Sequence, residues 1–131
     1  MSYALSTTTG LPFADAVDAV RVALAAQGFG VITEIDLAAT LKAKLDVEIA
    51  PQVILGACSP VLANEALAPE PTIGLLLPCN VVVRTADDGG TVVEAVDPEV
   101  LVRLSGNDAL QRVAGDAGGR LRAALDAVST T

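Results

Sequence analysis

The chain has 131 residues, of which 52% are hydrophobic, and sixteen acidic against eight basic residues give it a net charge of −8. A chain of this length is expected to form one domain with its own core, residues 1–131. The acidic excess disfavours nucleic acid as a partner, and no apolar stretch is long enough to span a membrane. Histidine is absent, which excludes serine–histidine triads, histidine proton shuttles and histidine-containing metal sites. No secretory leader is visible, so a cytoplasmic location is expected.

Apolar periodicity predicts ten elements in the order strand, helix, strand, helix, strand, helix, strand, strand, helix, helix. Strands are predicted where valine, isoleucine and threonine alternate or run together, and helices where apolar residues recur every three or four positions. In chain order, the predicted elements cover residues 3–9, 12–27, 29–35, 37–45, 52–56, 60–67, 80–85, 91–96, 98–104 and 110–128.

Residues that begin or end helices and turns support these boundaries. Gly28 can end the first helix in a left-handed conformation, and Asp36 can cap the second by accepting a backbone hydrogen bond. The run 87–90 between two valine-rich strands is the strongest hairpin signal in the chain. Before the last helix, Ser105 and Asp108 resemble a capping box.

The late hairpin indicates an α+β fold and disfavours a purely parallel, doubly wound sheet. We predict a curved, mostly antiparallel sheet with helices packed on one face, and a mixed α/β sandwich is the alternative. The last helix contains Gly115, Gly118 and Gly119, each of which costs roughly 1 kcal/mol relative to alanine. Their presence predicts a close approach of this helix to another backbone.

Two short segments, Cys58-Ser59 and Cys79-Asn80, hold the candidate site residues. Cys58 follows a predicted central strand and directly precedes a helix start, where free backbone amides and the helix dipole can stabilise a thiolate. Cys79 opens the next strand. If the two strands are antiparallel neighbours, both thiols lie at one edge of the sheet, and if they are joined by a parallel crossover, the thiols lie at opposite ends.

The plainest interpretation of both cysteines is that they are small buried hydrophobic residues. A structural disulfide is disfavoured in a reducing cytoplasm, and no Cys-x-x-Cys spacing indicates a metal site. We therefore expect the two thiols to be reduced, mostly buried and near each other, with Cys58 the more reactive. No cofactor is indicated.

Five segments form a pattern that runs through nearly the whole chain. They are Gln27–Val31, Glu34–Asp36, Leu55–Pro60, Gly74–Cys79 and Val96–Pro98. Together they resemble a bacterial and archaeal family called domain of unknown function 302, although the usual Cys-Asn-Pro is Cys-Ser-Pro here. The resemblance implies a fold similar to that of the TATA-binding protein and a homodimer, and it implies no activity. DNA binding does not follow, because the chain lacks a basic surface and wedge aromatics.

Three functions remain open. The first is a homodimeric binding module that holds a small ligand or protein partner in a groove near Cys58, Ser59, Cys79 and Asn80. The second is a thiol-based redox or metal-handling protein that uses the two cysteines. The third is a structural or interaction domain without pocket chemistry. No catalytic signature favours an enzyme, and the high apolar content indicates that some surface is buried between two copies.

Overall fold

The computed structural model describes residues 2–129 and contains one five-stranded sheet in the order β1-β5-β4-β3-β2. The strands are β1 Ala4–Thr9, β2 Gly30–Asp36, β3 Gln52–Cys58, β4 Cys79–Thr85 and β5 Thr91–Val96. The helices are α1 Phe13–Ala26, α2 Leu37–Leu45, α3 Pro60–Leu67, α4 Glu99–Ser105 and α5 Gln111–Ser129, with short 3-10 turns η1 Pro71–Leu76 and η2 Asp108–Leu110. This order and the α+β class confirm the prediction, and every strand pair is antiparallel.

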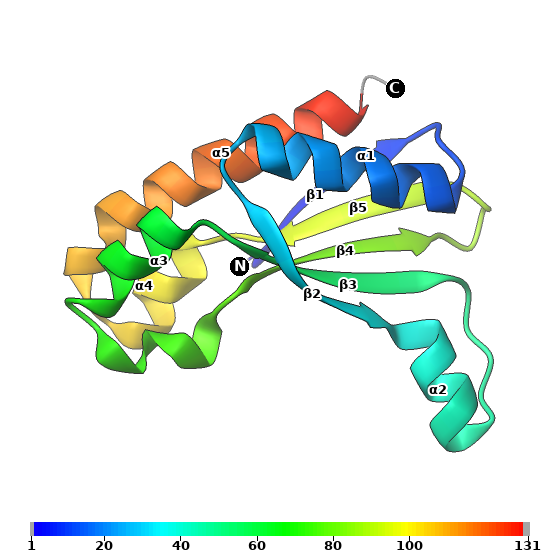
Figure 1. The fold of residues 1–131 in the computed structure, drawn as a ribbon, viewed down its shortest axis with the longest axis horizontal. Helices are drawn as coiled ribbons and strands as arrows, with labels where there is room; N and C mark the ends of the chain where they lie inside the picture. The colour runs from blue at the N-terminus through cyan, green and yellow to red at the C-terminus, as the bar shows by residue number, and fades with distance from the viewer. Residues whose placement is uncertain (1, 130–131) are drawn as a thin grey trace.

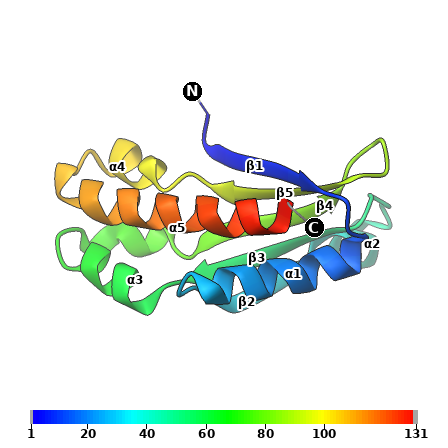
Figure 2. The ribbon, with the colours of Figure 1, turned by 90° about the horizontal axis from the view of Figure 1, so that it is seen from above.

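Helices α1 and α5 lie side by side on one face of the twisted sheet (Figures 1 and 2). The strands dictate this layer, because buried and half-buried residues alternate along β4 and β5. Val81, Val83 and Val93 are almost completely buried beneath the helices. Burial of these side chains and of the apolar stripe of α5 supplies the main driving force for folding. With helices over one face only, the sandwich alternative is not the observed fold.

Most of the boundary signals have the predicted geometry. Gly28 follows α1 with a φ of 84°. The Asp36 side chain accepts a hydrogen bond of 2.9 Å from the backbone amide of Ala39. The turn between β4 and β5 contains Gly89 at a φ of 86°, a conformation that favours glycine. These positions were recognisable because each answers a local backbone requirement.

Two predictions about the last helix are wrong. The residue that caps the 3-10 turn η2 leading into α5 is Asn107, whose side chain accepts from the amide of Ala109, whereas the hydroxyl of Ser105 donates back to the carbonyl of Leu101. The glycines do not approach another backbone within the described chain. A Cβ added at Gly115 or Gly119 would meet nothing within 4 Å, and one at Gly118 would meet the ring of Pro98 at 3.7 Å and no backbone atom.

The face of the sheet opposite α1 and α5 is uncovered within residues 2–129, and we call it the open face. Pairing register and alternation assign to it the outward side chains of Ala4, Ser6, Thr8, Ile35, Gln52, Ile54, Asn80, Val82, Arg84, Val92, Glu94 and Val96. Helices α3 and α4 flank one end of the strands, and α2 projects from the other end on the side of the open face (Figure 1). The helices that cover the sheet, α1 and α5, thus lie on one face as predicted, and α2 leaves the other face uncovered.

Helix α2 also buries none of its residues. Among the described residues, no helix is long and apolar enough to cross a membrane.

Candidate functional site

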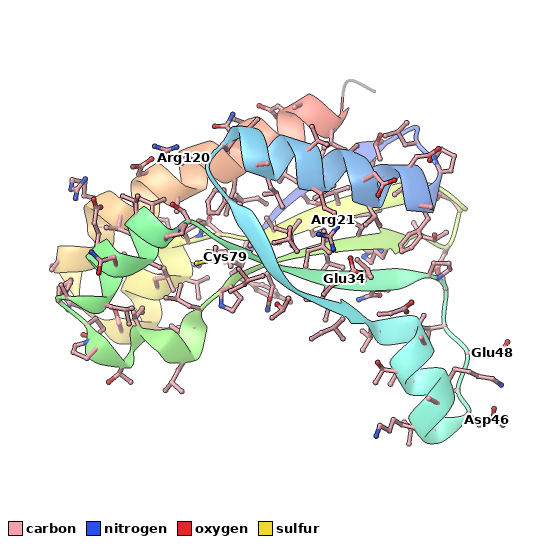
Figure 3. All side chains as sticks on the ribbon, in the orientation of Figure 1. Arg21, Glu34, Asp46, Glu48, Cys79 and Arg120 are labelled. Atoms are coloured by element: carbon pink, nitrogen blue, oxygen red, sulfur yellow. The ribbon has the colours of Figure 1, made fainter. Side chains whose placement is uncertain are left out.

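The two cysteine segments meet because β3 and β4 are antiparallel neighbours. Ala57 pairs with Cys79, so the end of β3 lies beside the start of β4. This pairing confirms the arrangement on which the prediction depended. Both cysteines are free, with Cys58 half-buried and Cys79 buried. Figure 3 shows Cys79 where the sheet meets the end of the molecule that carries α3 and α4.

Cys58 and Cys79 both line one partly open and almost wholly apolar cavity. Its other walls come from Phe29 before β2, from Leu62 and Ala66 on α3, and from α5. The space that a water-sized sphere can enter is about 30 Å³, which is room for one or two water molecules. The cavity as it stands therefore suits a very small apolar group.

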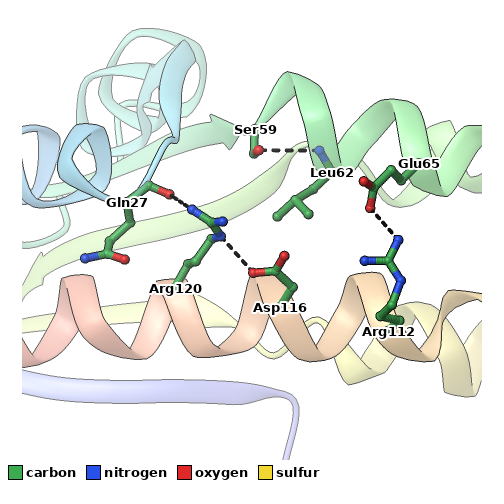
Figure 4. Close-up of polar contacts among 7 residues, drawn as sticks. All are labelled: Gln27, Ser59, Leu62, Glu65, Arg112, Asp116 and Arg120. Atoms are coloured by element: carbon green, nitrogen blue, oxygen red, sulfur yellow. Dashed lines mark hydrogen bonds and ion pairs between the residues drawn. The ribbon is translucent and has the colours of Figure 1, made fainter.

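Ser59 serves the backbone at this site. Its hydroxyl accepts a hydrogen bond of 3.4 Å from the amide of Leu62, and Pro60 occupies the first turn of α3 (Figure 4). A serine N-cap of this kind contributes about 1 kcal/mol to helix stability. Ser59 thus fixes the start of α3, whose side chains form a cavity wall.

Asn80 does not line this cavity, although it borders a neighbouring hollow of about 240 Å³ together with Cys79. It is exposed and belongs to the open face, since it pairs with Gly56 and successive residues of a strand point to opposite sides. The sequence placed Cys79 and Asn80 together because they are adjacent in the chain. The pleat of β4 sends their side chains to opposite faces of the sheet.

Two polar contacts join α5 to the opposite wall on either side of Leu62 (Figure 4). Arg112 on α5 pairs with Glu65 on α3 at 3.0 Å. Arg120 pairs with Asp116 at 2.7 Å and donates to the carbonyl of Gln27 at 3.1 Å. Exposed pairs of this kind contribute at most about 1 kcal/mol. These contacts therefore hold α5 only weakly to the neighbouring segments. The sequence analysis did not find them because Arg112 and Glu65, and Arg120 and Gln27, lie far apart in the chain.

Burial controls the chemistry of the inner thiol. Burial first, and the nearby Cys58 second, raise the pKa of Cys79 from the usual 9.0 to about 11. A thiol must be deprotonated to act as a nucleophile or a metal ligand. Cys79 is therefore unreactive at neutral pH.

We expect alkylation by iodoacetamide at pH 7.5 to modify Cys58 first and to leave Cys79 unmodified in the folded protein. The reason is that Cys58 is only half-buried, whereas Cys79 is buried and protonated. The variants Cys58→Ser and Cys79→Ser isolate the two rates, which intact-mass spectrometry follows over time. Rapid labelling of Cys79 at neutral pH would contradict this assignment and favour thiol chemistry at the site.

The same raised pKa predicts a loss of stability in alkaline solution. Below pH 9 the Cys79 thiol is protonated in both the folded and the unfolded chain, so its contribution to the free energy of unfolding is at its maximum. Between pH 9 and about 11 the unfolded chain loses this proton while the folded chain retains it, so the free energy of unfolding falls by about 2 to 3 kcal/mol at most. Urea unfolding of the wild type and of Cys79→Ala at a series of pH values measures this fall in the free energy of unfolding. The part that comes from Cys79 should be absent in the variant.

The fold and the site define a small α+β domain with an apolar cavity that contains two thiols. The chain belongs to the DUF302 family, a domain of unknown function, whose sequence model matches residues 5–128. A crystal structure of an uncharacterized conserved DUF302 protein from Bacillus stearothermophilus is 27% identical with a TM-score of 0.91, over 98% of this chain and 99% of that one. No curated protein matches the chain.

Proposed function

We propose that this protein is a homodimeric binding module that holds a small apolar ligand in the cavity beside Cys58 and Cys79. The observation that carries the proposal is the cavity itself, a partly open apolar space bordered by β3, α3 and α5. Apolar cavities in proteins stay dry and bind small apolar molecules. The acidic charge supports the further proposal that neither nucleic acid nor a membrane is a partner, and two reduced thiols suit the cytoplasm.

The cavity walls on α3 and α5 support this function over a purely structural role. Ala63 and Ala66 on α3 and Ala117 on α5 all line the cavity. Alanine leaves space that larger side chains would fill, and close packing is the rule in protein interiors. Within the described residues, the ion pair that ties α3 to α5 on this side is the weak, exposed contact between Arg112 and Glu65, so a modest movement of α3 enlarges the space.

Thiol-based redox chemistry is the second candidate, and the shared cavity of Cys58 and Cys79 favours it. Oxidation by a peroxide would join the two sulfurs in a disulfide, with both thiol hydrogens and the peroxide oxygens leaving as water. The raised pKa of Cys79 opposes this reaction. A metal-handling role would rest on two thiols alone, since no group of three ligand side chains gathers within residues 2–129.

Xenon under pressure is a suitable probe of the proposed ligand site, because the space has room for only one or two water-sized spheres. We expect it to raise the melting temperature of the wild-type protein and to shift the methyl resonances of Leu62 and Val113, which line the cavity. The variant Ala63→Leu should fill the space and abolish both effects. Ala26→Leu, an exposed position at the end of α1, is the matched control and should respond as wild type does.

Equal responses of the two variants, or no response of the wild type, would refute the ligand site. In that case a structural domain without pocket chemistry is the remaining function, since the test of Cys79 reactivity covers the redox candidate separately.

A further inference from the structure

We define the arm as α2 and the loop that follows it, residues 37–51. We propose that the second copy of the chain in the dimer covers both the open face and the arm. Each arm then lies on the open face of the other copy. This inference rests on the proposed homodimer and adds the surface through which it forms. Four features of the described chain support it.

The first feature is an apolar arm that buries nothing. No residue between 37 and 51 is buried, although five large aliphatic side chains occur there. They are Leu37, Leu41, Leu45, Val47 and Ile49. Leu45 is 66% exposed, and a hollow of about 370 Å³ lies between the arm and Phe13 on α1. A helix of this length is marginal in water without a packed face, so the arm needs a surface to cover it.

The second feature is the apolar surface of the open face. Ile35 pairs with Ile54, and Ile54 pairs with Val82, which places an aliphatic row across three strands. Beside this row, a hollow of about 380 Å³ is lined by Tyr3 and Val96 among others. Tyr3 is 72% exposed. This surface can receive the aliphatic side chains of an arm.

The third feature is the charge of the open face. The strand residues assigned to it include two charged side chains, Arg84 and Glu94, which pair with each other at 2.8 Å. The net charge of this face is therefore zero in a chain that carries −8. Like-charge repulsion does not oppose the approach of a second copy here, whereas the acidic remainder of the surface opposes it elsewhere.

The fourth feature is shape. The arm projects on the side of the open face, and Figure 3 shows Asp46 and Glu48 at its far end, away from the body. A two-fold axis beneath the sheet would lay each arm on the opposite face, so both uncovered surfaces would be covered at once. The arm and the outward positions of the strands together supply the roughly 20–30 residues per side of a standard interface.

Sedimentation equilibrium on wild type and four variants tests the inference. In the arm, Leu45→Asp is matched by Leu104→Asp on α4, because the two leucines are 66% and 69% exposed. On the open face, Asn80→Lys is matched by Asn64→Lys on α3, since both asparagines are exposed. Each member of a pair makes the same chemical change on a different surface. Far-UV circular dichroism confirms that every variant is folded.

We expect the wild type and both control variants to be dimeric at micromolar concentration. Leu45→Asp and Asn80→Lys should each weaken the dimer at least tenfold, because they place a charge in an apolar interface. A dimer that survives both substitutions would overturn this interface while leaving the homodimer intact. A monomeric wild type would overturn both and leave the arm to a different partner. Equal weakening by the control variants would also refute the assignment.

Discussion

Replacing Leu55 by alanine is expected to lower the free energy of unfolding by about 3 to 4 kcal/mol. Leu55 lies in β3 between β2 and β4, pairs with Val81, and has no exposed surface. The substitution removes buried apolar surface and leaves a cavity that the paired strands cannot close, so the transfer and cavity terms add. This is the larger of the two stability effects that the packing predicts.

Urea unfolding at one fixed protein concentration measures the loss. A fixed concentration is needed because the stability of a dimer depends on it. Leu104→Ala makes the same change at a leucine that is 69% exposed and should alter the free energy of unfolding by less than about 0.5 kcal/mol. Similar losses in the two variants would show that Leu55 is not held in a closely packed core.

Gly56→Ala is expected to destabilise the protein by about 1 to 3 kcal/mol through overpacking. A Cβ at this position would lie 2.1 Å from the hydroxyl oxygen of Thr33 on β2 and 2.8 Å from Cγ of Pro78. Both neighbours would have to move, and Pro78 directly precedes Cys79 and lines the cavity. The variant should therefore disturb the candidate site as well as the β2–β3 pair.

Two further variants separate this clash from a general effect of removing glycine. Thr33→Ala removes the closer contact, so the double variant should recover part of the loss, and the coupling in the double-mutant cycle measures that part. Gly119→Ala places a Cβ in open space within α5 and should stabilise the protein by about 0.5 to 1 kcal/mol. Wild-type stability of Gly56→Ala would contradict the predicted clash.

Local signals in the sequence determined most of the secondary structure. The valine-rich runs 80–85 and 91–96 favour extended backbone locally, and the turn residues 87–90 join them, so these signals predicted β4, β5 and their hairpin. Gly28, Asp36 and Ser59 were recognisable for the same reason, since each satisfies a backbone requirement within three or four residues. The capping box failed because Ser105 and Asn107 compete for the same turn.

Tertiary contacts decided that competition. The side chain of Asn107 also donates to the carbonyl of Pro69 and to Glu70, which lie far away in the sequence. The candidate site divides in the same way. The expected antiparallel pairing of the two strands correctly placed Cys58 near Cys79. Asn80 was grouped with them because it follows Cys79 in the chain, although the pleat of β4 places its side chain on the open face.

By itself, the sequence determined the order of the elements and the α+β class, and it predicted the meeting of the two thiols only on the condition that β3 and β4 pair in the antiparallel direction. Only the tertiary structure decided which apolar stripes are covered. The stripe Leu37, Leu41 and Leu45 on α2 has helical spacing, as does the buried stripe of α5 with its alternating steps of three and four, yet α2 buries no residue. The spacing of apolar residues predicts that a helix has an apolar side. Whether another surface covers that side depends on the path of the chain in the tertiary structure.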